Sequence, residues 1–440
     1  MNEKKFNLFD LISIGVGTII GAGVFSMMGY GIAYTGRGIV LALFLAMFLV
    51  VMQSVRYPIL SNLFELDGGA YAFTALTTPL SVAGINAAND VFFKVGSGAV
   101  TVLSIVEYLT ILVPAVGQYK TLSAVVILTL AYLIVVVGDK FAARVQNIMC
   151  ILMYIALALF VVYGFLNLDP SAYAGEPLLI NGVTGLMMAT ALMSYTCNGF
   201  QMLVGVGNAA ENPRRNIPLA FFLSAFVAAA IYALIGFAAT HAYPYSQTAG
   251  ANLGDLAKMM MPTALYLFFL VGGALFALAT SLLGSITAGY RPLMASANDG
   301  WLPSALGKRS KKGVPYVLLF LYVINLIPLL LGVELSDMAT MSLVPMGLIA
   351  ILTNLYALNV PTRFAKQWKE SGLRLSPALY RILIFLSCAA SVVLVVYCFL
   401  SNDLKVPTVV FTAVIFAYGI IRSRSGKVHI QAKQVYAEQA

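Results

Sequence analysis

The chain has 440 residues, of which 60% are hydrophobic and only 10% are charged, and its mean hydropathy is +0.90. Soluble globular proteins carry about 25% charged residues, so this composition excludes a soluble domain and indicates a protein that crosses a membrane many times. The formal net charge of +9 would indicate nucleic-acid binding only if the basic residues gathered on one soluble surface.

Twelve apolar stretches approach or exceed the roughly 20 residues that a helix needs to cross a bilayer. They lie at residues 9–34, 39–63, 84–114, 121–138, 145–168, 180–206, 217–242, 262–290, 314–333, 338–360, 377–400 and 406–421. With the N-terminus placed in the cytoplasm, most of the 26 Lys and Arg residues fall in cytoplasmic segments. The positive-inside rule therefore predicts two cytoplasmic termini, and the charge excess reports topology rather than nucleic-acid binding.

The first apolar stretch contains a glycine-rich run, Gly-Val-Gly-Thr-Ile-Ile-Gly-Ala-Gly-Val-Phe, at residues 15–25. Glycine is a poor helix former, and a segment in lipid cannot leave backbone N–H and C=O groups unpaired. We therefore expect the helix to break at Gly21-Ala22-Gly23, where protein or a water-filled cavity covers it. Gly15 and Gly17 fit close helix packing instead.

The sixth stretch contains a second interruption, Ser194-Tyr195-Thr196-Cys197-Asn198-Gly199-Phe200. Five crossings separate the two interruptions, and because this number is odd, a five-span repeat would be inverted. Broken helices at matching positions of inverted halves point to a substrate site. Free N–H groups at a half-helix N-terminus suit a carboxylate and free carbonyls suit an ammonium group, so the pattern favours a zwitterion such as an amino acid.

A structural interpretation of these glycines competes with the functional one. Gly17 and Gly21 have the small-xxx-small spacing that lets membrane helices pack closely. On the first stretch alone the two interpretations are balanced for Gly21-Ala22-Gly23, and the second break at Asn198-Gly199 favours function. Ala22→Val or Gly23→Val is then expected to abolish substrate binding without unfolding the protein.

Four motifs follow one another along the chain: Ile19-Ile20-Gly21-Ala22-Gly23-Val24-Phe25, Gly68-Gly69-Ala70-Tyr71, the run Glu211-Asn212-Pro213-Arg214-Arg215-Asn216-Ile217-Pro218, and the segment from Arg291 to Asp299-Gly300-Trp301-Leu302-Pro303. Together they resemble the motifs of the amino acid–polyamine–organocation transporter superfamily. They occur in the family's order and cover most of residues 1–310. The resemblance implies an all-α membrane protein of 12 transmembrane helices, a five-plus-five inverted repeat (LeuT-like) with two extra C-terminal helices. The repeats would be residues 1–168 and 178–360, followed by helices 11 and 12 and a cytoplasmic tail at 361–440.

The resemblance also implies roles for single residues. The expected substrate site consists of Ile20, Gly21, Ala22 and Gly23 around the carboxylate, Tyr195 as an aromatic gate, Cys197, Asn198 and Gly199 at the second break, and Ser285 on the eighth span. Ser281 falls where related folds have a sodium-site hydroxyl. Many family members carry a lysine in mid-span five, but Met153 stands there in this chain, so lysine-based coupling at that position is in doubt.

Three ionisable residues, Asp90, Lys94 and Glu107, fall inside the third apolar stretch. Charges inside a membrane are costly and are candidates for function. Asp90 and Lys94 are four residues apart on a helix, so they share a face and can neutralise each other. They are either a structural pair near a span end or part of a gating or coupling device. Glu107 lies deeper and is a candidate carrier of a coupled proton.

The leading functional hypothesis is a secondary amino acid transporter, a plasma (inner) membrane protein of a bacterium, that works by alternating access. The segments 11–33 and 177–207 contain no acidic residue, which favours neutral substrates over the alternative of a cationic amino acid or polyamine carrier. A channel or an amino acid sensor is the runner-up from another class, but no pore-loop repeat and no output domain is visible. We expect no enzyme activity, metal, cofactor, nucleic acid or obligate protein partner, only an amino acid substrate and the lipid bilayer.

Overall fold

The computed structural model describes residues 6–437, except 65, 67, 68, 138, 312, 333, 334 and 372–374. Within this described part, all regular structure is helical, and the extended contacts are two isolated bridges, Phe6 with Ala210 and Arg309 with Pro315. The expectation of an all-α membrane protein is confirmed at this level.

The N-terminal part of the chain alternates long apolar helices with short connectors. Its elements are α1 (Leu8–Ile19), α2 (Ala22–Thr35), the 3₁₀ turn η1 (Gly36–Gly38), α3 (Ile39–Ser54), α4 (Arg56–Leu63), α5 (Gly69–Thr77), α6 (Leu80–Leu112), α7 (Pro114–Gln118), α8 (Lys120–Val137), α9 (Asp139–Leu166) and η2 (Pro170–Tyr173).

The middle of the chain begins with the second interrupted helix. Its elements are α10 (Gly182–Thr196), the 3₁₀ helix η3 (Phe200–Ala209), α11 (Pro213–His241), α12 (Tyr245–Thr248), α13 (Leu253–Met260), α14 (Thr263–Phe268), the π-helical segment η4 (Phe269–Leu275) and α15 (Phe276–Asn298). The C-terminal part contains η5 (Ser304–Gly307), α16 (Tyr316–Leu331), α17 (Leu335–Ala357), α18 (Val360–Arg363), α19 (Ala365–Glu370), α20 (Pro377–Ser401), α21 (Lys405–Ser423) and α22 (Gln431–Ala437).

Eight helical stretches of the described chain are long and apolar enough to cross a membrane. They are Gly23–Leu63, Leu80–Leu112, Ile148–Leu166, Pro213–His241, Thr263–Asn298, Ser336–Ala357, Pro377–Ser401 and Lys405–Ser423, and the shorter apolar helices are Leu8–Ile19, Lys120–Val136 and Tyr316–Leu331. The outer helices expose rows of large apolar side chains, such as Leu122, Val126, Leu130 and Leu133 on α8 and Ile382, Phe385 and Leu386 on α20. An apolar belt of this kind marks a surface that lipid covers.

Some predicted span boundaries differ from the observed helices. The eighth predicted stretch ends at residue 290, whereas α15 continues through Pro292 to Asn298. Proline is tolerated inside membrane helices where neighbouring groups satisfy the freed carbonyl. In the third predicted stretch, which starts at residue 84, the observed helix α6 begins four residues earlier, at Leu80 directly after Pro79. α1 begins at a capping box in which Asn7 and Asp10 each accept the other's N–H.

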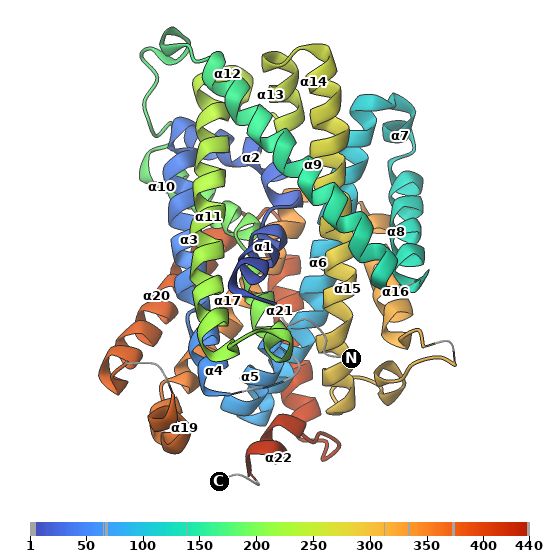
Figure 1. Ribbon diagram of the computed structural model, residues 1–440, viewed down its shortest axis with the longest axis vertical. Helices are drawn as coiled ribbons and strands as arrows, with labels where there is room; N and C mark the ends of the chain where they lie inside the picture. Colours follow the sequence, from blue (N-terminus) through green and yellow to red (C-terminus); the bar gives the residue numbers. More distant parts are fainter. Residues whose placement is uncertain are drawn as a thin grey trace.

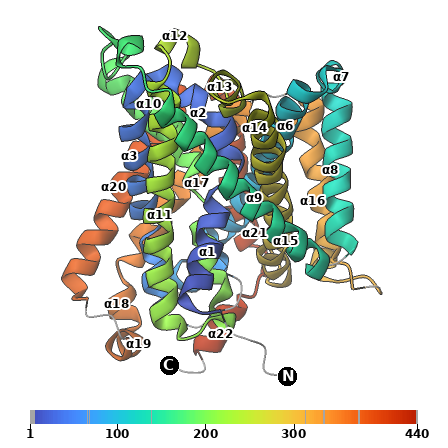
Figure 2. The ribbon, with the colours of Figure 1, turned by 45° about the horizontal axis from the view of Figure 1, so that its top comes forward.

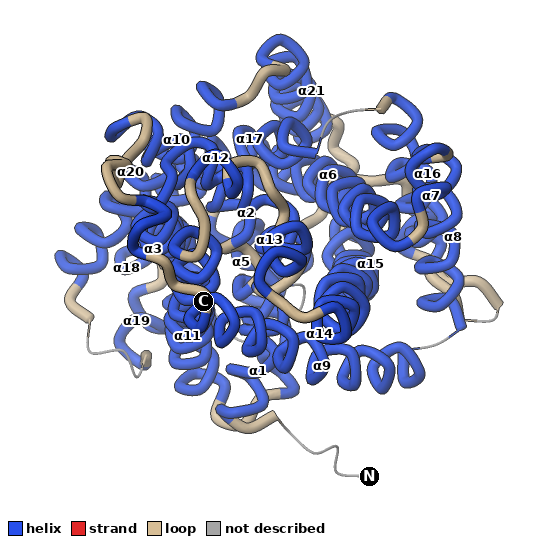
Figure 3. Tube along the Cα trace, turned by 90° about the horizontal axis from the view of Figure 1, so that it is seen from above, coloured by secondary structure: helices blue, strands red, loops and turns tan. Residues whose placement is uncertain are grey.

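The helices enclose α2, which lies near the centre of the molecule when seen from above (Figure 3) and packs against α10, α13 and α6. α9 crosses the bundle obliquely (Figure 1), while α4, α5, α19 and α22 gather at one end and α7, α12 and α13 at the other. Figure 2 shows α8 and α16 packed together on one flank and α20 on the opposite flank. The interrupted segments therefore lie inside the bundle, away from the apolar belt.

Candidate functional site

The first helix break lies between α1 and α2. Because α1 ends at Ile19 and α2 begins at Ala22, the non-helical residues are Ile20 and Gly21. The predicted interruption is present, and Gly23 lies in the first turn of the following half-helix. The side chain of Ile20 is only 1% exposed, so protein covers the break, as unpaired backbone inside a membrane requires. The side chain of Ala22 lies outside the described part.

The N-terminal end of α2 carries no side-chain cap. The first four N–H groups of any α-helix have no partner within the helix, and here they fall at residues 21–24. The positive end of the helix dipole lies at the same N–H groups and favours a negatively charged group there. Among the described residues, no side chain caps the backbone groups at this end of α2.

The second break follows α10, which ends at Thr196. Gly199 has φ +142°, a conformation that is essentially restricted to glycine. Cys197 is fully buried, whereas Asn198 and Tyr195 are half-buried. The chain then continues as the 3₁₀ helix η3 instead of resuming an α-helix.

The two breaks are in direct backbone contact. A Cβ added at Gly23 would lie 2.7 Å from Cα of Thr196, and one added at Gly199 would overlap the carbonyl oxygen of Thr18. Only hydrogen fits at either position. The expectation that Gly23→Val removes substrate binding while leaving the fold intact therefore does not hold, because the added side chain would push the two half-helices apart.

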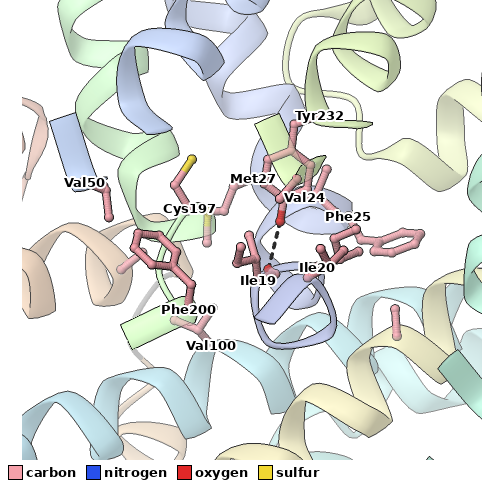
Figure 4. Packing of buried hydrophobic residues seen from close by; sticks show 14 of the residues in the cluster. Ile19, Ile20, Val24, Phe25, Met27, Val50, Val100, Cys197, Phe200 and Tyr232 are labelled. Atoms are coloured by element: carbon pink, nitrogen blue, oxygen red, sulfur yellow. Dashed lines mark hydrogen bonds between the residues drawn. The ribbon is translucent and has the colours of Figure 1, made fainter. Parts of the chain in front are cut away.

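Tyr232 of α11 joins the two breaks. Its hydroxyl oxygen lies 2.9 Å from the carbonyl oxygen of Ile19 and 3.1 Å from that of Thr196, and Figure 4 shows it above Ile19 among the buried side chains. Both carbonyls belong to the last residue of an interrupted helix, where no N–H follows at helical spacing. The hydroxyl has one hydrogen to share between them, so a single fully buried side chain holds the C-terminal ends of α1 and α10 together.

Gln201 organises the second break from within. Its Oε1 accepts the N–H of Gly199 at 2.9 Å, while its Nε2 donates to Oδ1 of Asn198 at 2.9 Å and to the hydroxyl of Ser54 on α3 at 3.1 Å. Asn198 in turn donates from Nδ2 to the carbonyl of Ser194 at 2.7 Å. The amide of Asn198, expected to belong to the substrate site, is thus engaged in stabilising the break itself.

Tyr108 of α6 supports the first half-turn of α2. Its hydroxyl donates to the carbonyl of Phe25 at 2.8 Å and accepts the N–H of Gly254 on α13 at 3.2 Å. The rings of Phe25 and Tyr108 also meet edge to face with their centroids 6.2 Å apart. α6 and α13 therefore hold α2 in place just beyond the break.

The predicted residues of α15 and α9 occupy three different surroundings. The hydroxyl of Ser281 packs directly against Gly21 at the first break. Ser285, expected on the substrate face, instead lines a small cavity with Lys94 and Asn325. Met153 is fully buried in the core on α9. The structure therefore brings Ser281 into contact with the first break and places Ser285, one turn further along α15, at the cavity.

The intramembrane charges lie on α6. Asp90 accepts a 3.5 Å hydrogen bond from Asn86, and among the described residues no carboxylate oxygen lies within 4.0 Å of the Lys94 ammonium. Direct ion pairing between Asp90 and Lys94 is therefore not present, although the two share one face of α6. Glu107 is half-buried and directly precedes Tyr108.

Two of the sequence motifs meet at the end of the molecule where α5 and α22 lie. The hydroxyl of Tyr71 donates to Asp299 at 2.7 Å, and the N–H of Gln431 donates to the same carboxylate at 3.2 Å. Burial raises the pKa of Asp299, and the two hydrogen bonds act in the opposite direction. Gly68, of the Gly68-Gly69-Ala70-Tyr71 motif, lies outside the described residues.

A group of three or more His, Cys, Asp or Glu side chains that could hold a metal ion is absent from the part of the chain that the structure describes. The fold and the two helix breaks in contact with each other define a multi-pass α-helical membrane protein with non-helical backbone in its interior. The chain belongs to the amino acid permease family, whose sequence profile matches residues 6–421. This membership places it among permeases and not among enzymes.

Individual relatives are distant but cover most of the chain. The chain is 25% identical over 378 residues to the branched-chain amino acid permease BcaP of Bacillus subtilis, which covers 81% of this chain and 78% of that protein. It is 24% identical to BcaP of Lactococcus lactis, covering 70% of this chain and 71% of that protein. It is also 25% identical to the vacuolar cationic amino acid transporter 4 of Arabidopsis thaliana, covering 70% of this chain and 55% of that protein.

The residues that join the breaks were not found from the sequence. Tyr232 and Tyr108 are single tyrosines in apolar helices, a pattern that ordinary core packing also produces, and their roles depend on which helices approach each other. Gln201 carried a usable signal, because an amide side chain two residues after a helix break is well placed to bond the freed backbone groups.

Proposed function

We propose that this permease is a secondary active transporter that carries neutral amino acids across the plasma membrane by alternating access around the two helix breaks. The observation that supports it most is the Tyr232 hydroxyl, which lies within hydrogen-bonding distance of the broken ends of both α1 and α10. Interrupted helices that meet inside a membrane bundle are the arrangement that transporters use for substrate and ions.

The substrate's carboxylate is proposed to bind the uncapped end of α2, at the backbone of Ile20, Gly21, Ala22 and Gly23. Tyr195, Cys197, Asn198 and Gly199 form the opposing wall, and Ser281 contacts the first break from α15. The side chains around the break are buried in this conformation, so the covering helices must move for a substrate to reach it. Alternating access supplies this movement.

Neutral substrates are favoured by the absence of acidic residues from segments 11–33 and 177–207. A carrier for cationic side chains would be expected to place a carboxylate near the breaks. The relatives named branched-chain amino acid permeases agree with this choice. The relatives named cationic amino acid transporters make cationic amino acids the second candidate.

The topology that goes with this function has 12 transmembrane helices and two cytoplasmic termini. The five-plus-five inverted repeat would comprise residues 1–168 and 178–360, with α20 and α21 as the two additional helices. Two features support it: the paired breaks five crossings apart, and the distribution of Lys and Arg between alternate connecting segments.

A thermal-shift screen of the purified protein tests the substrate class. Leucine at about 100 times its dissociation constant should stabilise the protein by about 2.7 kcal/mol, while arginine, putrescine and glutamate should leave the melting temperature unchanged. Stabilisation by arginine or putrescine alone would replace the neutral substrate by the cationic one. In liposomes, exchange of internal unlabelled leucine for external labelled leucine would establish transport itself.

A further inference from the structure

A small, mostly apolar cavity with a few polar side chains in its wall lies between α6, α8, α15 and α16. It is lined by Lys94, Tyr132, Ser285 and Asn325, together with apolar side chains, and it offers room for about one water molecule. Asn325 donates to the carbonyl of Leu321 and to the Tyr132 hydroxyl at 3.3 Å, but its buried Oδ1 has no hydrogen-bond partner among the described residues. A buried acceptor without a partner points to a bound water or ion.

Lys94 is the charged member of this cavity. It lies near the middle of the 33-residue helix α6, half-buried, with its side chain against Gly289 of α15. An ammonium without a carboxylate in contact is expensive inside a membrane, and losing its proton removes that cost. A water in the cavity could accept this proton and also donate to Oδ1 of Asn325.

Few other titratable side chains near Lys94 can accept or donate a proton. Asp90 lies one turn earlier on the same face of α6, and Tyr132 faces the cavity from α8. The cavity-lining residues of α15 and α16 are neutral: Leu282, Ser285, Ile286, Leu321 and Asn325. The other flank of α6 packs through Gly96 against Ser342 of α17 and through Phe92 against Phe411 of α21.

α15 connects this cavity to the first helix break. Ser281, Ser285 and Gly289 are spaced four residues apart and therefore lie along one face of the helix. Ser281 contacts Gly21 at the break, Ser285 lines the cavity, and Gly289 contacts the Lys94 side chain. A movement of α15 that follows substrate binding at the break would change the water contact of Lys94.

We propose that Lys94 is the proton-carrying group of this permease, with Asp90 and the cavity water as its route for proton exchange. This inference rests on the proposed transport function. In each cycle the Lys94 amine takes one proton from water on the side where substrate binds, and returns it to water on the side where substrate leaves. The Lys94 N–H bond that breaks on release is replaced by an O–H bond of water, so substrate movement is coupled to one proton.

The test uses the full-length protein in liposomes with labelled leucine. For wild type, an external pH about one unit below the internal pH should drive up to about tenfold accumulation of leucine inside the liposomes. Each coupled proton contributes one factor of ten to the ratio of internal to external leucine. Lys94→Met should retain leucine exchange at equal pH on both sides but lose gradient-driven accumulation. Lys94→Arg should behave in the same way, because arginine does not release its proton. Lys258→Met, which removes a lysine from the exposed face of α13, is the matched control and should resemble wild type.

The outcomes separate the two proposals. Exchange without any response of wild type to the pH gradient, or gradient-driven accumulation in Lys94→Met, would overturn the role of Lys94 and leave the transport function standing. Absence of leucine exchange in wild type would count against the neutral-transport proposal instead. If Lys94→Met does not fold, Lys94→Arg and Gly289→Ala take its place in the same assay. A Cβ at Gly289 would lie 3.0 Å from Cε of Lys94, the movable end of that side chain, so this variant should displace the ammonium, fold normally and lower the accumulation ratio.

Discussion

The two helix breaks are stabilised in different ways. The second break satisfies much of its own backbone, since Gln201 accepts the Gly199 N–H and bonds Asn198 within a few residues of chain. In the part of the chain that the structure describes, the first break has no such side chain: Tyr232 of α11 donates to the Ile19 carbonyl, and the end of α2 has no side-chain cap. The second break is therefore stabilised largely by its own segment of chain. The first break is stabilised by side chains of neighbouring helices and, as proposed, by a bound ligand.

Gly199→Ala should have the largest effect. The substitution adds a methyl group at φ +142° against the Thr18 carbonyl, so backbone strain and overlap add together and should cost more than about 3 kcal/mol. Size-exclusion chromatography and melting curves in detergent should show little folded protein. The control Gly175→Ala also has positive φ, +84°, but meets no atom within 4 Å, and it should remain folded. Equal behaviour of the two variants would show that the breaks are not in tight contact.

Tyr232→Phe removes the hydroxyl that both breaks share and leaves two buried carbonyls without this donor. Loss of a partner from a buried polar group costs about 1–3 kcal/mol, so the melting temperature should fall. Leucine exchange should weaken, because the ends of α1 and α10 are no longer held together. The exposed Tyr356 offers a matched Tyr→Phe control with no expected change. Unaltered stability and exchange in Tyr232→Phe would mean that the two breaks are held independently of each other.

Gln201→Ala tests whether the second break is self-contained. The substitution removes three part-buried hydrogen bonds, and because each contributes about 0.5–1.5 kcal/mol, the free energy of unfolding should fall by about 1.5 kcal/mol or more. In a double-mutant cycle with Ser54→Ala, the coupling free energy should be at least about 0.5 kcal/mol, as for residues within one network. A cycle between Gln201 and Tyr232 should show less coupling. A large coupling free energy between Gln201 and Tyr232 would contradict the conclusion that the two breaks are stabilised in different ways.

The sequence predicted the breaks because they depend on local chemistry. Gly21, Asn198 and Gly199 disfavour a continuous helix wherever they stand, and the resemblance supplied the expected partner segments. Tyr232 could not be found in this way, since its role depends on the approach of α11 to two carbonyls distant in sequence. The same limit applies to Ser285, because its place beside Lys94, one turn beyond Ser281, depends on how α15 packs against α6.

Ser281→Ala should have the smallest effect on stability, within about 0.5 kcal/mol, because removing one hydroxyl from a crowded contact leaves no large cavity. A substitution at position 281 is most informative in combination with Gly21→Ala, and there Ser281→Gly is used. A Cβ at Gly21 would overlap the Ser281 hydroxyl and lie 3.1 Å from its Cβ, so Gly21→Ala alone should destabilise the first break, and Ser281→Gly in the same chain should restore much of the loss. Melting temperatures of the single and double variants give the coupling free energy directly. Additive effects would show that α15 does not support the first break, and would also remove the proposed link from that break to Lys94.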